Sequence, residues 1–242
     1  MAEPSTEWSS IQYGGETINF SIARSPKRKT ACIAVYPSGE VRLTVPVRTS
    51  EAQARRYVEQ KAGWVLDKLK AFEAQGARDV KKQYVDGEIF LFLGREYALR
   101  ISQGHGPIVT LGDKTLNVIV PDPGDRETIR SAVFRWYRFQ AETYLREPVT
   151  TYARALGVFP PEFRVKNQSK RWGSCTAKNL LNFNLKIVMA PLEQLEYVAA
   201  HEVCHVKVKD HSPRYWAVLE SIMPDSDARK KALKTEGWKY EL

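Results

Sequence analysis

The sequence has few cysteines, few histidines and no long hydrophobic run. Its 242 residues include three cysteines and four histidines. Cys32, Cys175 and Cys204 are odd in number and far apart, so we do not expect a disulfide framework. No apolar stretch approaches the roughly 18 residues that a membrane helix needs. The first residues carry acids rather than an apolar signal segment. We therefore expect a cytoplasmic protein, kept reduced, that does not contact membranes.

A local concentration of one charge is also lacking, although the chain is basic, with a net charge of +9. The excess is spread along the sequence, and only residues 27–29 and 229–231 are tight basic triplets. For each triplet a solvated face is favoured over phosphate binding. No basic stripe interleaved with aromatic residues is present, so nucleic acid is an unlikely partner.

The N-terminal region is predicted to be β-rich. Alternating or apolar runs indicate a strand at 17–23 and hairpins at 31–45, 88–101 and 108–120. Ser50 and Gln53 form a capping box that opens one long helix reaching residue 72. Turn residues at 121–124 then predict a boundary, which divides the chain into regions 1–121 and 122–242.

The C-terminal region is predicted to alternate helices with short strands, so the whole chain belongs to the α+β class. Asp125 caps a long helix that Pro148 should end or kink. Strands are expected at 163–165 and 180–189. A helix after Pro191 carries an apolar stripe into residues 201–205, and two short helices, 214–222 and 225–233, follow.

Residues 201–205 form the pattern His-Glu-Val-Cys-His, which carries the chemistry of the sequence. On a helix, His201 and His205 lie about 40° apart on one face, one turn from each other. Two imidazoles so placed can bind one Zn²⁺ ion at about 2.0–2.1 Å. Glu202 projects about 100° further round, where it can reach a water molecule beside the metal and act as general base.

His211 is a candidate third ligand, because three of the four histidines fall within residues 201–211. An uninterrupted helix would turn His211 away from the site, so the helix must end first. Asp210 and Pro213 favour such a break. Three histidines would hold one zinc ion per chain and leave the fourth position open for water. The metzincin pattern turns on a glycine where this chain has Val208, and is therefore disfavoured.

Other interpretations of the motif stay open. The histidines could be packed or surface residues, or could hold a purely structural zinc ion. Cys204 could supply a thiolate ligand, although a small core residue is the favoured interpretation.

Further segments extend the pattern at residues 24–30, 86–88, 93–95, 170–175, 181–184, 197–205, 211–212, 216 and 223–225. Through them, nearly the whole chain resembles the YgjP-like small metallopeptidases, relatives of the minigluzincins and, more distantly, of SprT-like proteases. Three positions depart from the family pattern: Lys27 replaces an arginine, Val203 a leucine and Tyr215 a phenylalanine. The changes at Val203 and Tyr215 do not affect the proposed chemistry.

The resemblance implies a zincin-like fold in region 122–242, with a small sheet and an active-site helix. It also implies that His201, His205 and His211 hold zinc while Glu202 acts as base. By analogy, an extended peptide would pair with a sheet edge formed by residues 171–175 and 180–185. Tyr215 and Arg171 are candidates for contacts with substrate or transition state.

Three functions follow from these observations. The first is zinc-dependent cleavage of a peptide or protein substrate. The second is a pyrophosphatase acting on nucleoside triphosphates such as UTP, an activity also attached to the family, although Mg²⁺ with oxygen ligands would be more usual for it. The third is a non-catalytic zinc module that binds nucleic acid. In the second case the phosphate contacts would come from Arg24, Lys27, Arg28, Lys29, Lys170 and Arg171.

Overall fold

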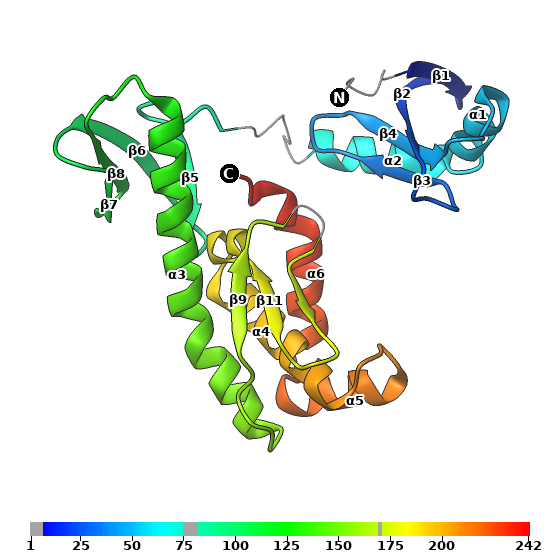
Figure 1. The fold of residues 1–242 in the computed structure, drawn as a ribbon. Coiled ribbons are helices and arrows are strands. Elements are labelled where there is room, and N and C mark those ends of the chain that lie inside the picture. Colours follow the sequence, from blue (N-terminus) through cyan, green and yellow to red (C-terminus); the bar gives the residue numbers. More distant parts are fainter. Residues whose placement is uncertain (1–6, 75–81, 169–170) are drawn as a thin grey trace. The chain divides into compact units, whose positions relative to one another are not determined.

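A computed structural model describes residues 7–74, 82–168 and 171–242. The chain divides into two compact units, Met1–Val80 and Lys81–Leu242 (Figure 1). Both units combine helices with strands, as an α+β fold requires. Among the described residues, no helix combines the length and the apolar character needed to cross a membrane.

The first unit is a four-stranded sheet with two helices. Its strands are β1 (Glu7–Tyr13), β2 (Glu16–Ser25), β3 (Cys32–Val35) and β4 (Val41–Pro46), in the order β1-β2-β4-β3. The predicted 31–45 hairpin is present as the antiparallel pair β3–β4. Phe20 and Leu43 from the sheet are fully buried, and together with Val58 and Val65 from the helices they form the core of this unit.

The single long helix predicted in this unit is instead two, α1 (Glu51–Glu59) and α2 (Ala62–Ala74). The Ser50–Gln53 capping box opens α1, as the sequence predicts. Gln60 caps its C-terminus and the chain restarts at Ala62. The apolar stripe continues across this interruption, because residues before and after it are buried in the same core.

The second unit contains two sheets and most of the helices. One sheet has the order β5-β6-β8-β7 and the other β10-β11-β9. The strands are β5 (Ile89–Phe92), β6 (Arg95–Gln103), β7 (Ile108–Leu111), β8 (Thr115–Val120), β9 (Phe163–Lys166), β10 (Gly173–Cys175) and β11 (Leu181–Asn184). The helices are α3 (Arg126–Ala155), α4 (Leu192–Lys207), α5 (Pro213–Ile222) and α6 (Ser226–Glu236), with 3₁₀ turns η1 (Leu185–Met189) and η2 (Gly237–Lys239).

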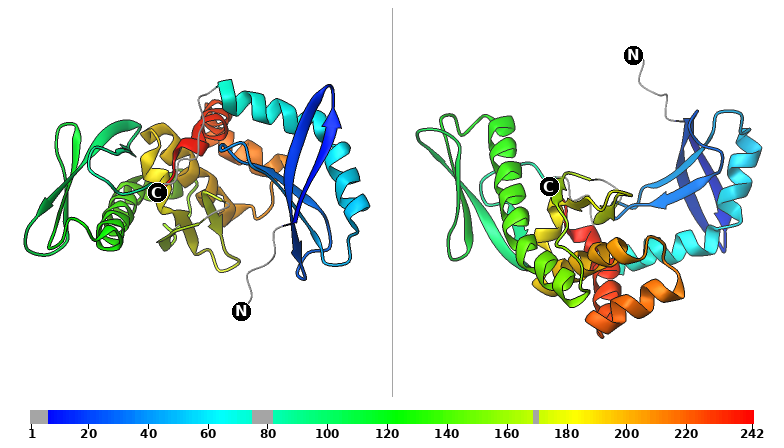
Figure 2. Two further views of the ribbon diagram at one scale, coloured as in Figure 1. Left: turned by 90° about the horizontal axis from the view of Figure 1, so that it is seen from above. Right: turned by 60° about the horizontal axis from the view of Figure 1, so that its bottom comes forward.

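Helix α3 connects the parts of the second unit. It contacts β8 and β9 as well as η1 and α4, and Figure 2 shows it running beside the β5–β8 sheet. The side chain of Asp125 accepts two backbone N–H groups of the first turn. The helix does not end at Pro148, because Leu145, Val149 and Ala153 on either side of the proline are buried in the core.

The boundary expected between residues 121 and 122 falls inside the second unit. The reason is that the β5–β8 sheet and α3 share one hydrophobic core. The rings of Phe92 and Trp136 lie 4.9 Å apart, and the Tyr137 hydroxyl donates a hydrogen bond of 2.5 Å to the Leu91 carbonyl oxygen. The turn residues at 121–124 therefore mark a bend within a domain.

The strand expected at 180–189 is shorter, because β11 ends at Asn184 and a 3₁₀ turn follows. Asn184 explains this change. Its side-chain oxygen accepts the Lys186 N–H, which caps η1, while its amide nitrogen donates to the carbonyl oxygens of Gln168 and Arg171. The same side chain thus ends the strand and anchors the segment that leads into β10.

Candidate metal centre

Helix α4 places the His-Glu-Val-Cys-His pattern at one site. Its residues Leu195, Ala199 and Val203 are fully buried, which fixes the rotation of the helix against the core. α4 contacts α3 and α5 as well as strand β10. His201 is partly exposed, whereas Glu202 and His205 are buried.

The helix ends where the sequence requires it to end. α4 stops at Lys207, and Val208 has extended backbone with φ −133° and ψ 113°. Asp210 accepts the backbone N–H of Ser212 at 3.1 Å, and α5 then begins at Pro213. This turn returns His211 toward α4.

His201, His205 and His211 each offer a ring nitrogen, and these three atoms lie within 4.8 Å of one another. The Nε2 atoms of His201 and His211 are 3.1 Å apart. Nitrogens bound tetrahedrally at about 2.1 Å from zinc would be about 3.4 Å apart. His205 Nδ1 lies 3.0 Å from the Val208 carbonyl oxygen. That contact places its proton on Nδ1 and leaves Nε2 free as a ligand. The three side chains therefore fit a metal ion.

The protonation states also suit a metal. Burial lowers the pKa of His201 to about 3, with smaller contributions from His205, His211 and Lys230. Burial likewise lowers the pKa of His205. Both rings are thus neutral near pH 7, which is the form that binds metal.

Tyr215 packs against the rings of His201 and His205. It does not line the cavity that lies beside Glu202 and His201. Its side chain is fully buried and stacks on His205, with ring centroids 4.6 Å apart. Its hydroxyl donates a hydrogen bond of 2.9 Å to the His201 carbonyl oxygen. The sequence suggested that Tyr215 contacts the transition state. In the structure its hydroxyl is bonded to the backbone of α4.

Glu202 lies beside the histidines in a closely packed environment. Its Oε2 is buried and has no hydrogen-bond partner within the described part of the chain. Burial raises its pKa to about 8, and the charge of Arg171 opposes this shift. A Cβ atom at Gly173 would lie 2.5 Å from both Cγ and Oε1 of Glu202. Only glycine therefore leaves room for Glu202 in this position.

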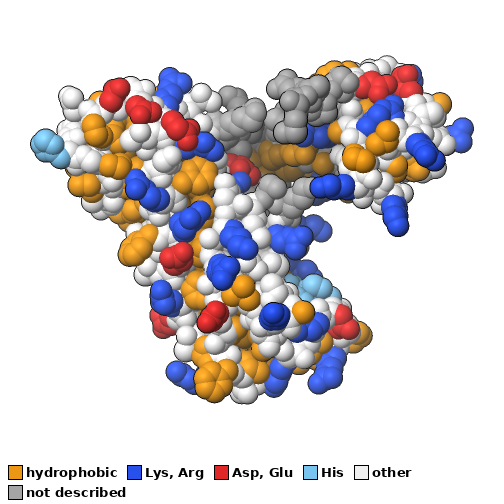
Figure 3. Space-filling view, viewed as in Figure 1, with side chains coloured by type: hydrophobic (Ala, Val, Ile, Leu, Met, Phe, Trp, Pro, Cys, Tyr) orange, Lys and Arg blue, Asp and Glu red, His pale blue; other side chains and the backbone are white. Residues whose placement is uncertain are grey.

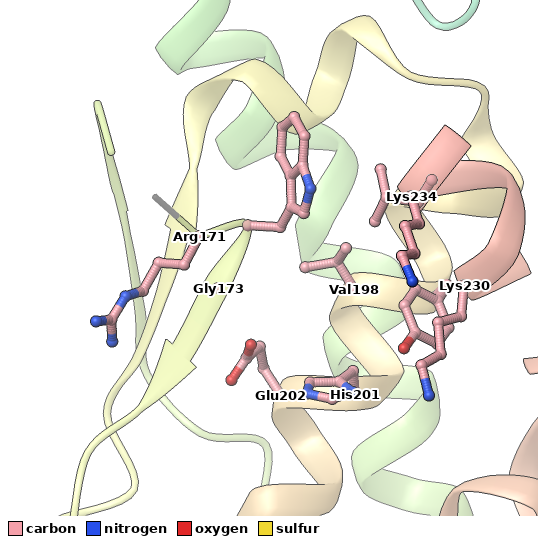
Figure 4. Close-up of a pocket in the computed structure, with 10 residues that line it drawn as sticks. Arg171, Gly173, Val198, His201, Glu202, Lys230 and Lys234 are labelled. Carbon is pink, nitrogen blue, oxygen red and sulfur yellow. The ribbon is translucent and has the colours of Figure 1, made fainter. Parts of the chain in front are cut away.

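Beside Glu202 and His201 lies a cavity of about 370 Å³. Its lining residues are Arg171, Trp172, Gly173, Tyr197, Val198, His201, Glu202, Lys230, Leu233 and Lys234. Figure 4 shows Arg171 and Gly173 on one side, Lys230 and Lys234 from α6 on the other, and Glu202 with His201 between them. On the molecular surface, histidine side chains are visible next to lysine and arginine side chains at the lower right of Figure 3.

Arg171 is the predicted phosphate contact that the structure places at this cavity. Its guanidinium, however, points away from the cavity in Figure 4. Lys170 lies outside the described residues. The residues at 24 and 27–29 belong to the first unit. There Arg24 forms an ion pair of 3.0 Å with Glu7 and donates to the Thr49 carbonyl oxygen.

Several residues of the site were missed by sequence reasoning. Lys230 belongs to the triplet 229–231, which was interpreted as a solvated face, yet it lines the cavity together with Lys234. Their spacing of four residues places them on one side of a helix, a signal that was available in the sequence. Trp172 and Trp216 belong to the segments that match the family pattern, but their contacts depend on other elements and could not be predicted from spacing.

Comparison with known proteins agrees with the geometry. A family model described as YgjP-like, metallopeptidase domain, matches residues 29–236. A search of curated proteins finds no match.

Proposed function

Since the chain belongs to the YgjP-like metallopeptidase family, we propose that it is a zinc-dependent peptidase that cleaves peptide bonds. Family membership supports a metal-dependent hydrolase. The three histidine nitrogens of the candidate site are ligands that suit zinc better than Mg²⁺ or Ca²⁺. We assign one zinc ion per chain to His201, His205 and His211, and a zincin-like fold to the unit that carries them.

The buried position of Glu202 beside the histidines is the observation that carries this proposal. It is a buried carboxyl group next to the three histidines, and its Oε2 has no partner within the described residues. Such an orphaned oxygen is costly unless function needs it, since a buried acceptor normally finds a donor. The water molecule that attacks the substrate would supply that donor, and a carboxylate so placed can act as its general base. A cation held by the histidines would oppose the burial that raises the pKa of Glu202 to about 8, and would favour the ionised form that a base requires.

The residues then have distinct roles. When bound, zinc lowers the pKa of a water toward about 7 and polarises the scissile carbonyl. Glu202 accepts the proton of the attacking water and passes it to the leaving amine. The neutral histidines hold their positions, with the His205 ring oriented by its contact with the Val208 carbonyl oxygen. Tyr215 bonds the backbone carbonyl oxygen of His201 and so supports the helix rather than the ring. Strand β10 lies at the edge of its sheet, where an extended peptide can add as a further strand.

A second candidate keeps the site and changes the bond to the phosphoanhydride of a nucleoside triphosphate. The observation in its favour is that Arg171, Lys230 and Lys234 line the cavity. A three-histidine site suits this reaction less well, because magnesium with oxygen ligands is its usual metal.

The deciding experiment compares wild type with Glu202→Gln after purification with the native metal. We expect about one zinc per chain in both proteins, and a loss of casein cleavage of about 10²-fold or more in the variant. Cleavage at the wild-type rate by Glu202→Gln would overturn its role as base. Release of pyrophosphate from UTP, without peptide cleavage, would favour the second candidate. Full zinc occupancy without turnover of either substrate would favour a binding module.

The role of His211 is tested separately, by titrating metal-free protein with zinc. His211→Ala should lower zinc affinity about tenfold or more, because one of three nitrogen ligands is lost. His105→Ala is the matched control, since His105 lies outside the histidine cluster. Equal affinities for His211→Ala and wild type would remove His211 from the ligand set.

A further inference from the structure

The cavity beside the candidate metal centre has an excess of positive charge. Lys230 and Lys234 contribute cations, Arg171 lines the cavity with its guanidinium directed away from it, and among the described lining residues Glu202 is the single carboxylate. Lys230 and Lys234 are four residues apart on α6, so they lie on one side of that helix. Within the described residues, neither lysine has a carboxylate partner within 4.0 Å.

Lys230 is held in place by an aromatic ring. Its Nζ lies 3.9 Å from the centroid of the Trp216 ring, a distance at which a cation–π interaction is favourable. The same ring lies 5.5 Å from the ring of His211. A positive charge is therefore maintained next to the metal ligands, on the side where α6 borders the cavity.

The neighbouring Arg229 fixes α6 in position but adds no free charge. It forms ion pairs with Asp225 at 2.8 Å and with Glu196 on α4 at 2.7 Å. It also donates to the Glu193 carbonyl oxygen at 3.1 Å. The triplet 229–231 thus separates into one cation that binds α4 and one that reaches the cavity.

The remaining wall of the cavity is largely apolar. Trp172, Val198 and Leu233 line it together with the two lysines, and Leu233 is buried in the core. A glutamate side chain matches this combination, because two methylene groups carry its carboxylate. The phosphate groups of a nucleotide have no apolar part to place between the two lysines and such a wall.

We propose that this cavity is a specificity subsite that binds an acidic side chain of the peptide substrate, next to the scissile bond. Lys230 and Lys234 bind the carboxylate, while Trp172, Val198 and Leu233 contact its aliphatic stem. The proposal rests on the proposed peptidase function and adds a substrate class to it. Lys231 on the same helix does not line the cavity, so Lys231→Gln, which removes a charge from α6 outside the cavity, is the control.

The first test uses zinc-loaded wild-type protein and a peptide library with one residue type fixed at each position. Glutamate and aspartate should be enriched at one position adjacent to the cleaved bond. A matched pair of peptides, with Glu or Gln at that position, should then differ about five- to tenfold in kcat/KM at low salt. The difference should shrink at high salt, since screening weakens exposed ion pairs.

The second test uses variants. In Lys230→Gln/Lys234→Gln the Glu and Gln peptides should be cleaved at equal rates, and Lys231→Gln should keep the preference of wild type. Equal cleavage of both peptides by wild type, or a preference that survives the double variant, overturns the subsite.

A third measurement separates failure of the subsite from failure of the peptidase function. Zinc-loaded Glu202→Gln is titrated calorimetrically with blocked pentapeptides that carry Glu or Gln at the centre. Tighter binding of the Glu peptide, lost in Lys230→Gln/Lys234→Gln, supports the subsite even if wild type cleaves no peptide. Equal binding of the two peptides overturns it. The subsite is also overturned if the double variant changes the KM for UTP but changes the binding of neither peptide. The anion bound by the lysines is then a phosphate.

Discussion

At the scale of single residues, the close approach of Gly173 to Glu202 constrains the candidate site. A side chain at position 173 would place its Cβ 2.5 Å from Glu202 Oε1, well inside van der Waals contact. The carboxyl group would have to move, since the three atoms nearest to such a Cβ all belong to Glu202. A shift of about 1 Å in a catalytic group can reduce the rate about 10²-fold.

Gly173→Ala is therefore expected to lower kcat about 10- to 100-fold while zinc stoichiometry stays at one per chain. Metal analysis and peptidase assays of the same preparation measure both quantities. Gly63→Ala is the control, because the Cβ there would meet its nearest neighbour at 3.4 Å. A fully active Gly173→Ala protein would show that Glu202 can accommodate a Cβ atom at position 173 without losing its function.

Tyr215 illustrates how one hydrogen bond separates a supporting role from a catalytic one. Tyr215→Phe keeps the ring stacked on His205 and removes only the bond to the His201 carbonyl oxygen. We expect a loss of about 1 kcal/mol in the free energy of unfolding and a change in kcat/KM of less than about tenfold. Urea unfolding and peptidase kinetics test this. A loss of kcat of about 10²-fold or more would instead indicate a direct transition-state contact.

At the scale of elements, the site depends on how α4 and α6 are joined. α4 carries His201, Glu202 and His205, whereas α6 carries the two lysines of the cavity. The contacts of Arg229 with Glu193 and Glu196 connect the two helices. The positions of the histidines relative to the lysines are thus set partly by Arg229, which does not line the cavity itself.

Arg229→Ala should lower the free energy of unfolding by about 1–3 kcal/mol, because charged hydrogen bonds are lost and Glu196 is left without its partner. It should also reduce the preference for acidic peptides without changing zinc affinity. Lys231→Ala, a truncation on the same helix, is the control for both measurements. If unfolding of Arg229→Ala matches that control, the link between α4 and α6 lies elsewhere.

At the scale of the whole molecule, the second unit contains every residue of the candidate site. Its sheets and helices share one hydrophobic core, and the first unit has a separate one. A fragment of residues 82–242 should therefore unfold cooperatively and bind one zinc ion by itself. Circular dichroism melting and metal analysis of the fragment test this. A fragment without a cooperative transition would show that the first unit is needed for folding.

The sequence by itself determined the local parts of the site. The spacing of His201 and His205 places them on one helix face, since the period of the α-helix requires no other information. The termination of α4 before His211 and the capping of α1 by Ser50 also follow from neighbouring residues. Such features depend on contacts within a few positions of the chain, which short patterns encode directly.

Only the tertiary structure decided the remainder, because it depends on elements far apart in sequence. Gly173 meets Glu202 only when β10 packs against α4. Lys230 reaches the cavity only because α6 is joined to α4 and Trp216 holds the ammonium group. The unit boundary lies near residue 80 rather than 121, since the β5–β8 sheet buries its apolar face on α3. The periodicity of a sequence can show that one face of an element is buried, but not which distant element covers it. Those contacts are therefore known only from the packing.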